Sequence, residues 1–160
     1  MTTEPKKKKR LALIASKGTL DAAYPPLILA TTAASMNWEV AIFFTFYGMN
    51  IVNKKKIGHL QVAPLANPAA PMPVPNLLGA IPGMTAVATW MMRRMMKKQN
   101  MPTIPEFLDL ARQLGVRLIA CSTTIGVMSV KDEDLVMGTE CAGAAAFLEF
   151  ASEADVTLFI

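Results

Sequence analysis

The two cysteines are the strongest nucleophiles of this chain, and Cys121 occupies a distinctive position. It follows the apolar stretch Val116–Ala120, which predicts a strand, and it precedes three small hydroxyl residues. We expect a helix to begin just after it, so that backbone N–H groups and the positive end of a helix dipole face the sulfur. Both favour the thiolate, which is the reactive form. The alternative is a thiol that only fills the core, because free cysteines are often buried.

The residues after Cys121 are suited to hold a negatively charged sulfur. Ser122, Thr123 and Thr124 can donate hydrogen bonds to a thiolate or a persulfide, and their small size leaves room for an extra sulfur atom. No histidine is near in sequence, so an activated cysteine–histidine pair is not predicted. The only histidine, His59, falls in a proline-rich stretch, where a surface-loop role is the favoured interpretation. No metal-binding spacing such as C-x-x-C occurs.

The second cysteine, Cys141, is expected at the start of a helix over Cys141–Ala154. This helix leads into the last predicted strand, so it should run from the carboxyl edge of the sheet to the amino edge. Cys141 should then share the edge that carries Cys121. Whether the two thiols come within disulfide range stays open at this point.

Apolar segments separated by turn residues predict the elements that position these side chains. Asp21 is the expected N-cap of the first helix, although Pro25 and Pro26 favour a start at Pro25. Thr103 and Glu106 form a capping-box pattern, and Gly115 ends the helix that follows them. The expected strands are Arg10–Ser16, Trp38–Phe46, Val116–Ala120 and Val156–Ile160, and the expected helices are 22–36, Met84–Gln99, Ile104–Leu114, a short one after Cys121, and Cys141–Ala154.

This order predicts an α/β fold, a single-domain sandwich in which a parallel sheet carries helices on both faces. Reaction sites in such sheets lie beyond the carboxyl ends of the strands, which is where Cys121 falls. We expect residues 1–8 to form a flexible basic tail and residues 9–160 to form the domain. A proline-rich insertion at about 57–83 interrupts the domain, and its apolar side chains are a candidate cover for the Cys121 thiol.

The stretch SKGTLD, residues 16–21, follows the first predicted strand and is a candidate phosphate or flavin loop. It contains one glycine, whereas the dinucleotide-binding fingerprint contains three. An ordinary turn from strand to helix is therefore the favoured interpretation.

Charge is unevenly distributed along the chain. Residues 1–100 contain 13 lysines and arginines but three acidic residues, while residues 101–160 contain three and nine. This polarity suits an acidic partner, an anionic membrane surface or a nucleic acid, or it is solvated surface. In the predicted helix Met84–Gln99, one side carries methionines and the other carries Arg93, Arg94, Lys97 and Lys98. Packing against the fold or another subunit is favoured over contact with a partner or membrane.

The run Leu27–Phe46 contains one charged residue and is long enough to span a membrane. We favour a helix that stops at Asn37, followed by a buried strand, because polar residues interrupt the first half and aromatic and β-branched residues fill the second. No signal peptide is predicted, and a reducing cytoplasm is the expected compartment.

Two long stretches make this chain similar to a known family. They are GTLDAAYPPLILATTAASMNWEVAIFFTFYGMNIV and ACSTTIGVMSVKDEDLVMGTECAGAAAFLEFA. The FFTFYG segment, the Ala-Cys pair followed by Ile125, Val127 and Met128, and KDEDLVMG with Gly138 are the most specific parts. The chain resembles the DsrE/DsrF-like family, and the second DsrE subtype most closely, from about Arg10 to Ile160.

The resemblance implies a flavodoxin-like fold of the DsrE type and a role in sulfur relay. Members carry sulfane sulfur as a cysteine persulfide and exchange it with TusA-like or rhodanese-like partners, which makes the protein similar to a sulfurtransferase. The matching carrier position is Cys121. The resemblance also implies a homo-oligomer of three or more subunits, no metal, no organic cofactor and no nucleic acid, with peripheral membrane contact through the basic segments as an additional candidate.

Two alternatives stay open beside the sulfur carrier. The first is a thiol redox protein in which Cys141 resolves an oxidised Cys121. The second is a non-catalytic binding protein with a flavodoxin-like fold. Uptake of sulfur by the thiol, loss of two hydrogens or no change in mass would distinguish the three.

Overall fold

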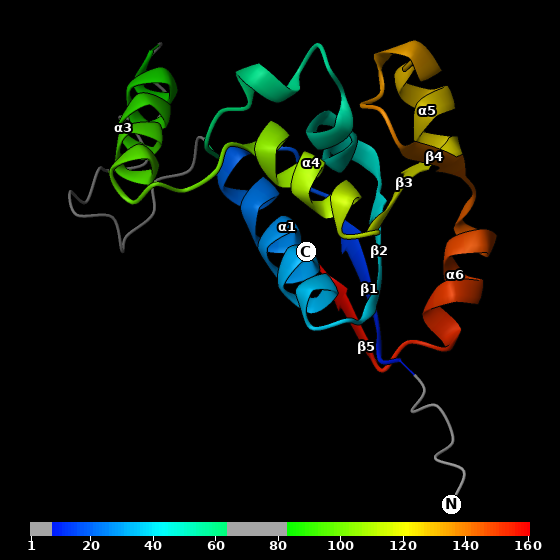
Figure 1. Cartoon of the computed structure of the whole chain (residues 1–160). Coiled ribbons are helices and arrows are strands. Elements are labelled where there is room, and N and C mark those ends of the chain that lie inside the picture. Colours follow the sequence, from blue (N-terminus) through cyan, green and yellow to red (C-terminus); the bar gives the residue numbers. More distant parts are fainter. Residues whose placement is uncertain (1–7, 64–82) are drawn as a thin grey trace, which may run out of the picture.

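The computed structural model describes residues 8–63 and 83–160, where the chain forms a parallel sheet covered by helices (Figure 1). The strands are β1 (Arg10–Ala15), β2 (Glu39–Phe44), β3 (Arg117–Cys121), β4 (Thr139–Ala142) and β5 (Val156–Phe159). The α-helices are α1 (Leu20–Ser35), α3 (Met84–Lys98), α4 (Ile104–Gln113), α5 (Ser122–Met128) and α6 (Ala144–Ser152). Three short 3-10 helices, η1 (Phe46–Val52), η2 (Ile57–His59) and η3 (Asp132–Asp134), lie in the connections.

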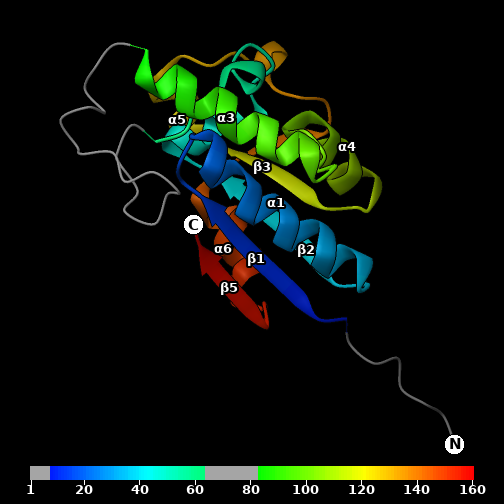
Figure 2. The same cartoon turned by 90° about the vertical axis from the view of Figure 1, so that its left-hand side faces the viewer.

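The sheet has the strand order β4-β3-β2-β1-β5, and every neighbouring pair is parallel. Helices α1 and α4 cover one face and α6 covers the other, as the two views show (Figures 1 and 2). The central strands are apolar because both of their faces are covered, as a parallel sheet requires. The predicted α/β fold, a parallel sheet between layers of helices, is confirmed.

Aromatic pairs hold both helical layers in place. On one side, Tyr24 of α1 meets Phe107 of α4 edge-on, with ring centroids 5.9 Å apart. On the other side, Phe43 of β2 stacks on Phe147 of α6 at 4.9 Å. Because side chains alternate along a strand, this stack identifies the sheet face that carries Phe43 as the α6 face.

Helix α1 begins at Leu20, two residues before the expected start at residue 22 and five before the alternative start at Pro25. Thr19 takes the N-cap position predicted for Asp21, and Asp21 instead accepts a hydrogen bond from the N–H of Ala63. Pro25 and Pro26 lie inside the helix, where each removes a backbone hydrogen bond. Tertiary packing offsets this local cost, since the side chain of Pro26 is fully buried.

Other local stop and start signals act as predicted. The backbone N–H of Thr103 donates to Glu106 Oε2 at 2.6 Å, and the backbone N–H of Glu106 donates to the Thr103 side chain, which completes the capping box of α4. Gly115 follows α4 with a φ of 78°, and Asn37 follows α1 with a φ of 63°. Asn37 thus separates α1 from β2 within the apolar run Leu27–Phe46. Among the described residues, no helix is both long enough and apolar enough to cross a bilayer.

The segment after Gly138 differs from the expectation. Residues Thr139–Ala142 form the short edge strand β4, and α6 begins only at Ala144, so the predicted helix Cys141–Ala154 is wrong in its first turn. The sequence pattern did not predict this strand, because β4 is an exposed edge strand with polar side chains and needs no apolar run. Backbone pairing with β3, rather than local propensity, holds β4 in place.

Helix α3 presents a different face to the protein than the methionine pattern predicts. The Thr89 hydroxyl accepts a hydrogen bond from the N–H of Val62, and Arg93 donates to the carbonyl oxygens of Gly58 and Leu60. Several apolar residues of α3 are exposed: Val87, Trp90, Met91 and Met95. Polar anchoring by Thr89 and Arg93 therefore decides how the helix is turned.

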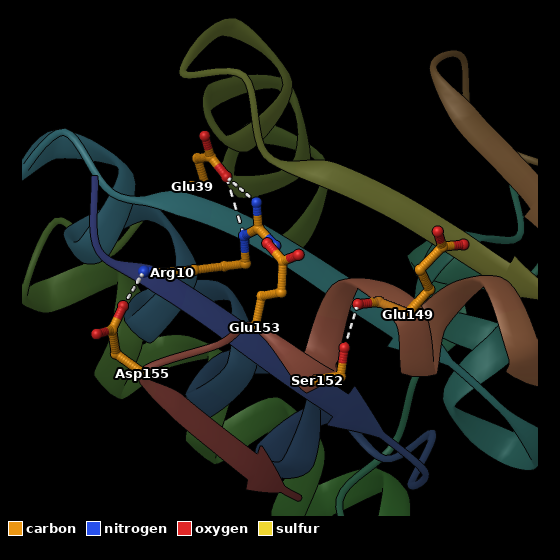
Figure 3. Close-up of polar contacts among 6 residues, drawn as sticks. All are labelled: Arg10, Glu39, Glu149, Ser152, Glu153 and Asp155. Carbon is orange, nitrogen blue, oxygen red and sulfur yellow. Dashed lines mark hydrogen bonds and ion pairs between the residues drawn. The ribbon is translucent and has the colours of Figure 1, made fainter. Parts of the chain in front are cut away.

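An ion-pair cluster joins the strand starts at the amino edge of the sheet (Figure 3). The Arg10 guanidinium bridges Glu39 at the start of β2 and Glu153 after α6, each at 2.8 Å. The backbone N–H of Arg10 donates to Asp155 at 2.7 Å, just before β5. The same guanidinium lies over the ring of Phe150, 4.7 Å from its centroid. One residue therefore connects three elements at this edge.

Two expectations lie mostly outside the described residues. The flexible tail was expected over residues 1–8, of which only residue 8 is described, and residues 64–82 of the proline-rich insertion are not described. The candidate cover over Cys121 belongs to that insertion and stays a prediction. The described flanks, which include η2 and the start of α3, lie at the carboxyl end of β1.

Candidate functional site

Cys121 is the last residue of β3, and its side chain is only 6% exposed. The preceding residues Leu118–Ala120 are fully or almost fully buried, so apolar packing anchors the strand up to the cysteine. Helix α5 begins at the next residue, and Cys121 takes its N-cap position with an extended backbone. The structure therefore contains the predicted junction of a strand, a thiol and a helix start.

Two threonine hydroxyls meet beside this thiol. Thr45 directly follows β2, and its Oγ1 lies 3.2 Å from Oγ1 of Thr124 in α5. Thr124 is 3% exposed and accepts a hydrogen bond from the backbone N–H of Phe46 at 3.0 Å. Thr124 Oγ1 has two lone pairs, so it can accept from both this N–H and the Thr45 hydroxyl, which leaves its own proton for another acceptor. The sulfur of Cys121 is such an acceptor.

The pKa of the Cys121 thiol lies below its ordinary value. Burial is the largest single influence, and it raises the pKa because it disfavours the charged form. Hydrogen bonds to the sulfur together outweigh burial: they come from the hydroxyl and N–H of Thr124, the hydroxyl of Thr45 and the N–H of Thr123. These donors are uncharged, so dipoles stabilise the thiolate in the manner of a helix start.

The three hydroxyl residues predicted to stabilise a thiolate are placed differently. Thr124 is buried and directs its hydroxyl to the site, while Thr123 contributes its backbone N–H and is exposed. Ser122 is exposed, and its side chain lies near Gly143 after β4. Within the described hydrogen bonds, the side chains of Ser122 and Thr123 make no contact with the sulfur.

Thr45 is the site residue that sequence reasoning missed. The pairing of Phe44 with Ala120 aligns β2 and β3, so the next residues, Thr45 and Cys121, lie opposite each other. FFTFYG, residues 43–48, carries the family resemblance, but its residue types alone predict no role for Thr45. The useful signal was that two strand ends carry polar side chains, which meet only if the strands are neighbours.

The backbone after Thr45 turns sharply. Phe46 has a φ of 46°, a conformation that an aromatic residue rarely adopts, and this turn aims its N–H at Thr124. Gly48 allows the turn to pack against β1, because a Cβ there would lie 2.0 Å from the carbonyl oxygen of Ala15. The FFTFYG segment is thus shaped by a close approach of two backbones beside the thiol.

Exposed apolar side chains border the same site. Phe46 is 64% exposed, its neighbour Tyr47 is 65% exposed, and Val127 of α5 is 74% exposed. We call these three residues the apolar rim. They come from the two segments, the start of η1 and α5, that the hydrogen bond between Phe46 and Thr124 joins.

Cys141 lies at the predicted edge of the sheet but on the other face. It pairs with Ala120 of β3, whereas Ala142 pairs with Cys121. Paired residues in neighbouring strands share a face, so the side chain of Cys141 points away from that of Cys121. Both thiols are free, and Cys141 is exposed. A disulfide between them would require β4 to move.

The remaining candidates lie elsewhere. His59 belongs to η2, and Gly18 and Thr19 of the SKGTLD stretch belong to the β1–α1 turn, two strands away from Cys121. No cluster of three or more metal-binding side chains occurs among the residues that the structure describes.

Comparisons with known proteins agree with this arrangement. The chain is 46% identical over 158 residues to the Sulfur carrier protein DsrE2 of Allochromatium vinosum, covering 95% of this chain and 98% of that protein. It is 31% identical over 162 residues to the uncharacterised protein YrkE of Bacillus subtilis, covering 95% and 97%. The crystal structure of the ychN protein from E. coli has the same fold, with a TM-score of 0.59 at 12% identity over 95% of this chain and 99% of that one.

The sequence profile of the DsrE/DsrF/DrsH-like family matches residues 7–159. This match covers Cys121, Thr45 and every described helix and strand. The chain therefore belongs to the DsrE/DsrF/DrsH-like family.

Proposed function

We propose that this protein is a sulfur carrier that holds sulfane sulfur as a persulfide on Cys121. The environment of the thiol supports this most directly: it is nearly buried, and uncharged donors lower its pKa. The lowered pKa increases the thiolate fraction, and the thiolate is the form that takes up sulfur. The name of the 46% identical relative, a sulfur carrier protein, supports the same function.

Loading is an exchange in which atoms and electrons balance. The Cys121 thiolate attacks the outer sulfur of a donor persulfide, R–S–SH, and a bond forms between that sulfur and Cys121 Sγ. The donor S–S bond breaks, and its electron pair leaves with R–S⁻. The proton stays with the transferred sulfur, so no oxidant or reductant is consumed. Unloading is the same exchange, with an acceptor thiolate attacking the outer sulfur on Cys121.

The surrounding residues have separate tasks in this exchange. The hydroxyl and N–H of Thr124 and the N–H of Thr123 hold the thiolate before attack and receive it again after unloading, and the Thr45 hydroxyl, which shares a hydrogen bond with Thr124 Oγ1, supports them. Dipoles that are already in place need no rearrangement when charge arrives. Burial of Cys121 limits access of small reductants to the persulfide.

The partners in this proposal are TusA-like or rhodanese-like proteins, which bring the donor or acceptor sulfur. They dock on the apolar rim of Phe46, Tyr47 and Val127, because it is the exposed surface beside the site. Other exposed apolar groups, Leu148 of α6 and Phe159 of β5, lie away from it and suit a contact between subunits in a homo-oligomer of three or more chains. The proposal includes a reducing cytoplasm, with peripheral membrane contact through basic segments such as α3.

The alternative redox function receives no support from the positions of the thiols. Cys141 cannot resolve an oxidised Cys121 by forming a disulfide while β3 and β4 keep their pairing. The alternative of a non-catalytic binding protein gives no reason for a thiol with a lowered pKa.

Mass spectrometry after incubation with a sulfane-sulfur donor tests the function. The reduced wild-type chain should gain about one sulfur mass, and reducing agent should remove it. Cys121→Ser should abolish loading and keep the fold, because serine is nearly isosteric with cysteine.

Cys141→Ser is the matched control and should load like the wild type. Loading that persists in Cys121→Ser and disappears in Cys141→Ser would reverse the assignment. Loss of two hydrogens from the wild type would instead support the redox function, and an unchanged mass would support the binding protein.

A further inference from the structure

A cavity of about 460 Å³ lies at the carboxyl end of β1, apart from the Cys121 site. Gly18 and Thr19 of the β1–α1 turn form one wall, and residues of η1, η2 and the start of α3 form the others. The cavity thus lies between the connections that leave β1 and β2, at the carboxyl edge of the sheet. Ligands of parallel α/β sheets bind at this edge.

Basic side chains converge on this cavity. Lys55, Lys56 and His59 line it, and they come from the short segment that follows η1. An ion pair of 2.7 Å between Lys55 Nζ and Asp134 Oδ1 holds Lys55 in place. Lysine acts as a compact point charge toward phosphate groups, so this lining favours an anion.

The backbone segments around the cavity approach one another closely. A Cβ on Gly18 would lie 2.1 Å from the carbonyl oxygen of Tyr47, so only glycine fits there. The N–H of Leu20 donates to the carbonyl oxygen of Gln61 at 2.8 Å, which fixes the wall formed by residues 60–62 against α1. These backbone contacts fix the cavity walls on both sides, independently of the side chains that line it.

Two polar groups in the wall are not used by the fold as described. Thr19 sits at the N-cap of α1, yet its side chain makes no capping hydrogen bond. Asn50 Oδ1 is buried and has no hydrogen-bond partner among the described residues. The Thr19 hydroxyl can therefore donate to a ligand in the cavity, whereas Asn50 Oδ1 is an acceptor closed to solvent and is suited to an ordered water rather than to an anion.

From these observations we propose that the cavity binds a small organic phosphate. Lys56 and His59 hold the phosphate, while Lys55, whose charge is paired with Asp134, borders it. Leu60 and Val62 supply apolar surface for the organic part, and the volume exceeds what a free phosphate ion fills. SKGTLD thus contributes Gly18 and Thr19 to a phosphate site, although it lacks the three-glycine fingerprint.

His59 is the only histidine of the chain, so its imidazole signal in an NMR spectrum reports on this cavity alone. Full-length protein is titrated with inorganic phosphate, glycerol 3-phosphate or AMP at constant pH and ionic strength. We expect a saturable shift of the His59 signal, with the organic phosphates binding more tightly than inorganic phosphate. Lys56→Gln should weaken their binding about tenfold, as expected for removal of one charged contact.

Lys98→Gln removes a basic residue of α3 that does not line the cavity, and it should bind like the wild type. A shift that is not saturable, that survives Lys56→Gln unchanged or that sodium chloride alone reproduces would overturn the site. Equal affinity for inorganic phosphate and both organic phosphates would overturn the organic class of the ligand. Loading of Cys121 is measured separately, so this result does not depend on the sulfur-carrier function.

Discussion

The two edges of the parallel sheet differ in the kind of polar group that they carry. At the amino edge, Arg10 joins Glu39 and Glu153, and Arg117 joins Glu140 at 2.8 Å, so full charges are paired. At the carboxyl edge around Cys121, the groups that favour the thiolate are hydroxyls and backbone N–H groups. Paired charges hold the strand starts together. A site that gains and loses negative charge is instead stabilised by dipoles, because dipoles leave no unpaired counter-ion when the negative charge is lost.

Phe150 shows how the amino edge is closed. The guanidinium groups of Arg10 and Arg117 both lie over its ring, at 4.7 and 5.7 Å from the ring centroid. Each guanidinium therefore has a carboxylate partner and an aromatic surface. The carboxyl edge instead exposes its aromatic groups, Phe46 and Tyr47. The comparison predicts that changes at the carboxyl edge alter chemistry and changes at the amino edge alter stability.

Thr124→Val should produce the largest effect among the following three changes. It removes a hydroxyl that donates to Cys121 and that accepts the N–H of Phe46. The pKa of Cys121 should rise, so the pH profile of alkylation by iodoacetamide should move to higher pH. Leaving the Phe46 N–H unsatisfied should also lower the free energy of unfolding by about 1–3 kcal/mol, measured by urea denaturation.

The pH dependence of this loss has a defined sign. The pKa of Cys121 is lower in the folded chain than in an ordinary thiol, so the thiolate stabilises the fold. This contribution is present at high pH and is lost as the pH falls through the folded pKa, so the thiolate part of the difference between wild type and Thr124→Val should grow with pH. Thr123→Val is the control, because Thr123 contributes only its N–H. An equal shift of the alkylation profile in both variants would contradict the assignment.

Arg10→Met tests the opposite edge. It keeps an apolar side chain of similar length but removes the ion pairs with Glu39 and Glu153. The midpoint of thermal unfolding should fall, while the alkylation profile of Cys121 should stay that of the wild type. Lys131→Met, which breaks an exposed pair with Glu133, should change neither quantity measurably. A change in Cys121 reactivity in Arg10→Met would show that the two edges are coupled.

Phe46→Gly should have the smallest effect on stability and the most selective effect on function. Glycine adopts the φ of 46° without strain, so relief of about 1 kcal/mol offsets the greater freedom of the unfolded chain. Loading from a small sulfane donor should continue, but exchange with a TusA-like protein should slow because the apolar rim loses its largest group. Equal rates of exchange in wild type and variant would remove Phe46 from the docking surface.

Much of the site could be predicted because its signals are local. The strand before Cys121 is a short apolar run, the hydroxyl residues after it open α5, and Gly115 and Asn37 end helices through positive φ. The capping box of Thr103 and Glu106 is likewise formed between residues three positions apart. Each of these signals depends only on residues that are close in sequence. It therefore favours the same helix or strand boundary whatever the tertiary fold.

Other features were decided only when distant segments met. Thr45 reaches Thr124 across 79 positions because β2 and β3 are neighbours, an order that no local pattern encodes. Packing allows α1 to keep two prolines, and backbone pairing makes a strand of Thr139–Ala142. The alternation of side chains then separates Cys141 from Cys121, although both lie at one edge. The sequence by itself determined which residues could carry the chemistry, while register and strand order, which are set by long-range hydrogen bonds and burial, decided which of them meet.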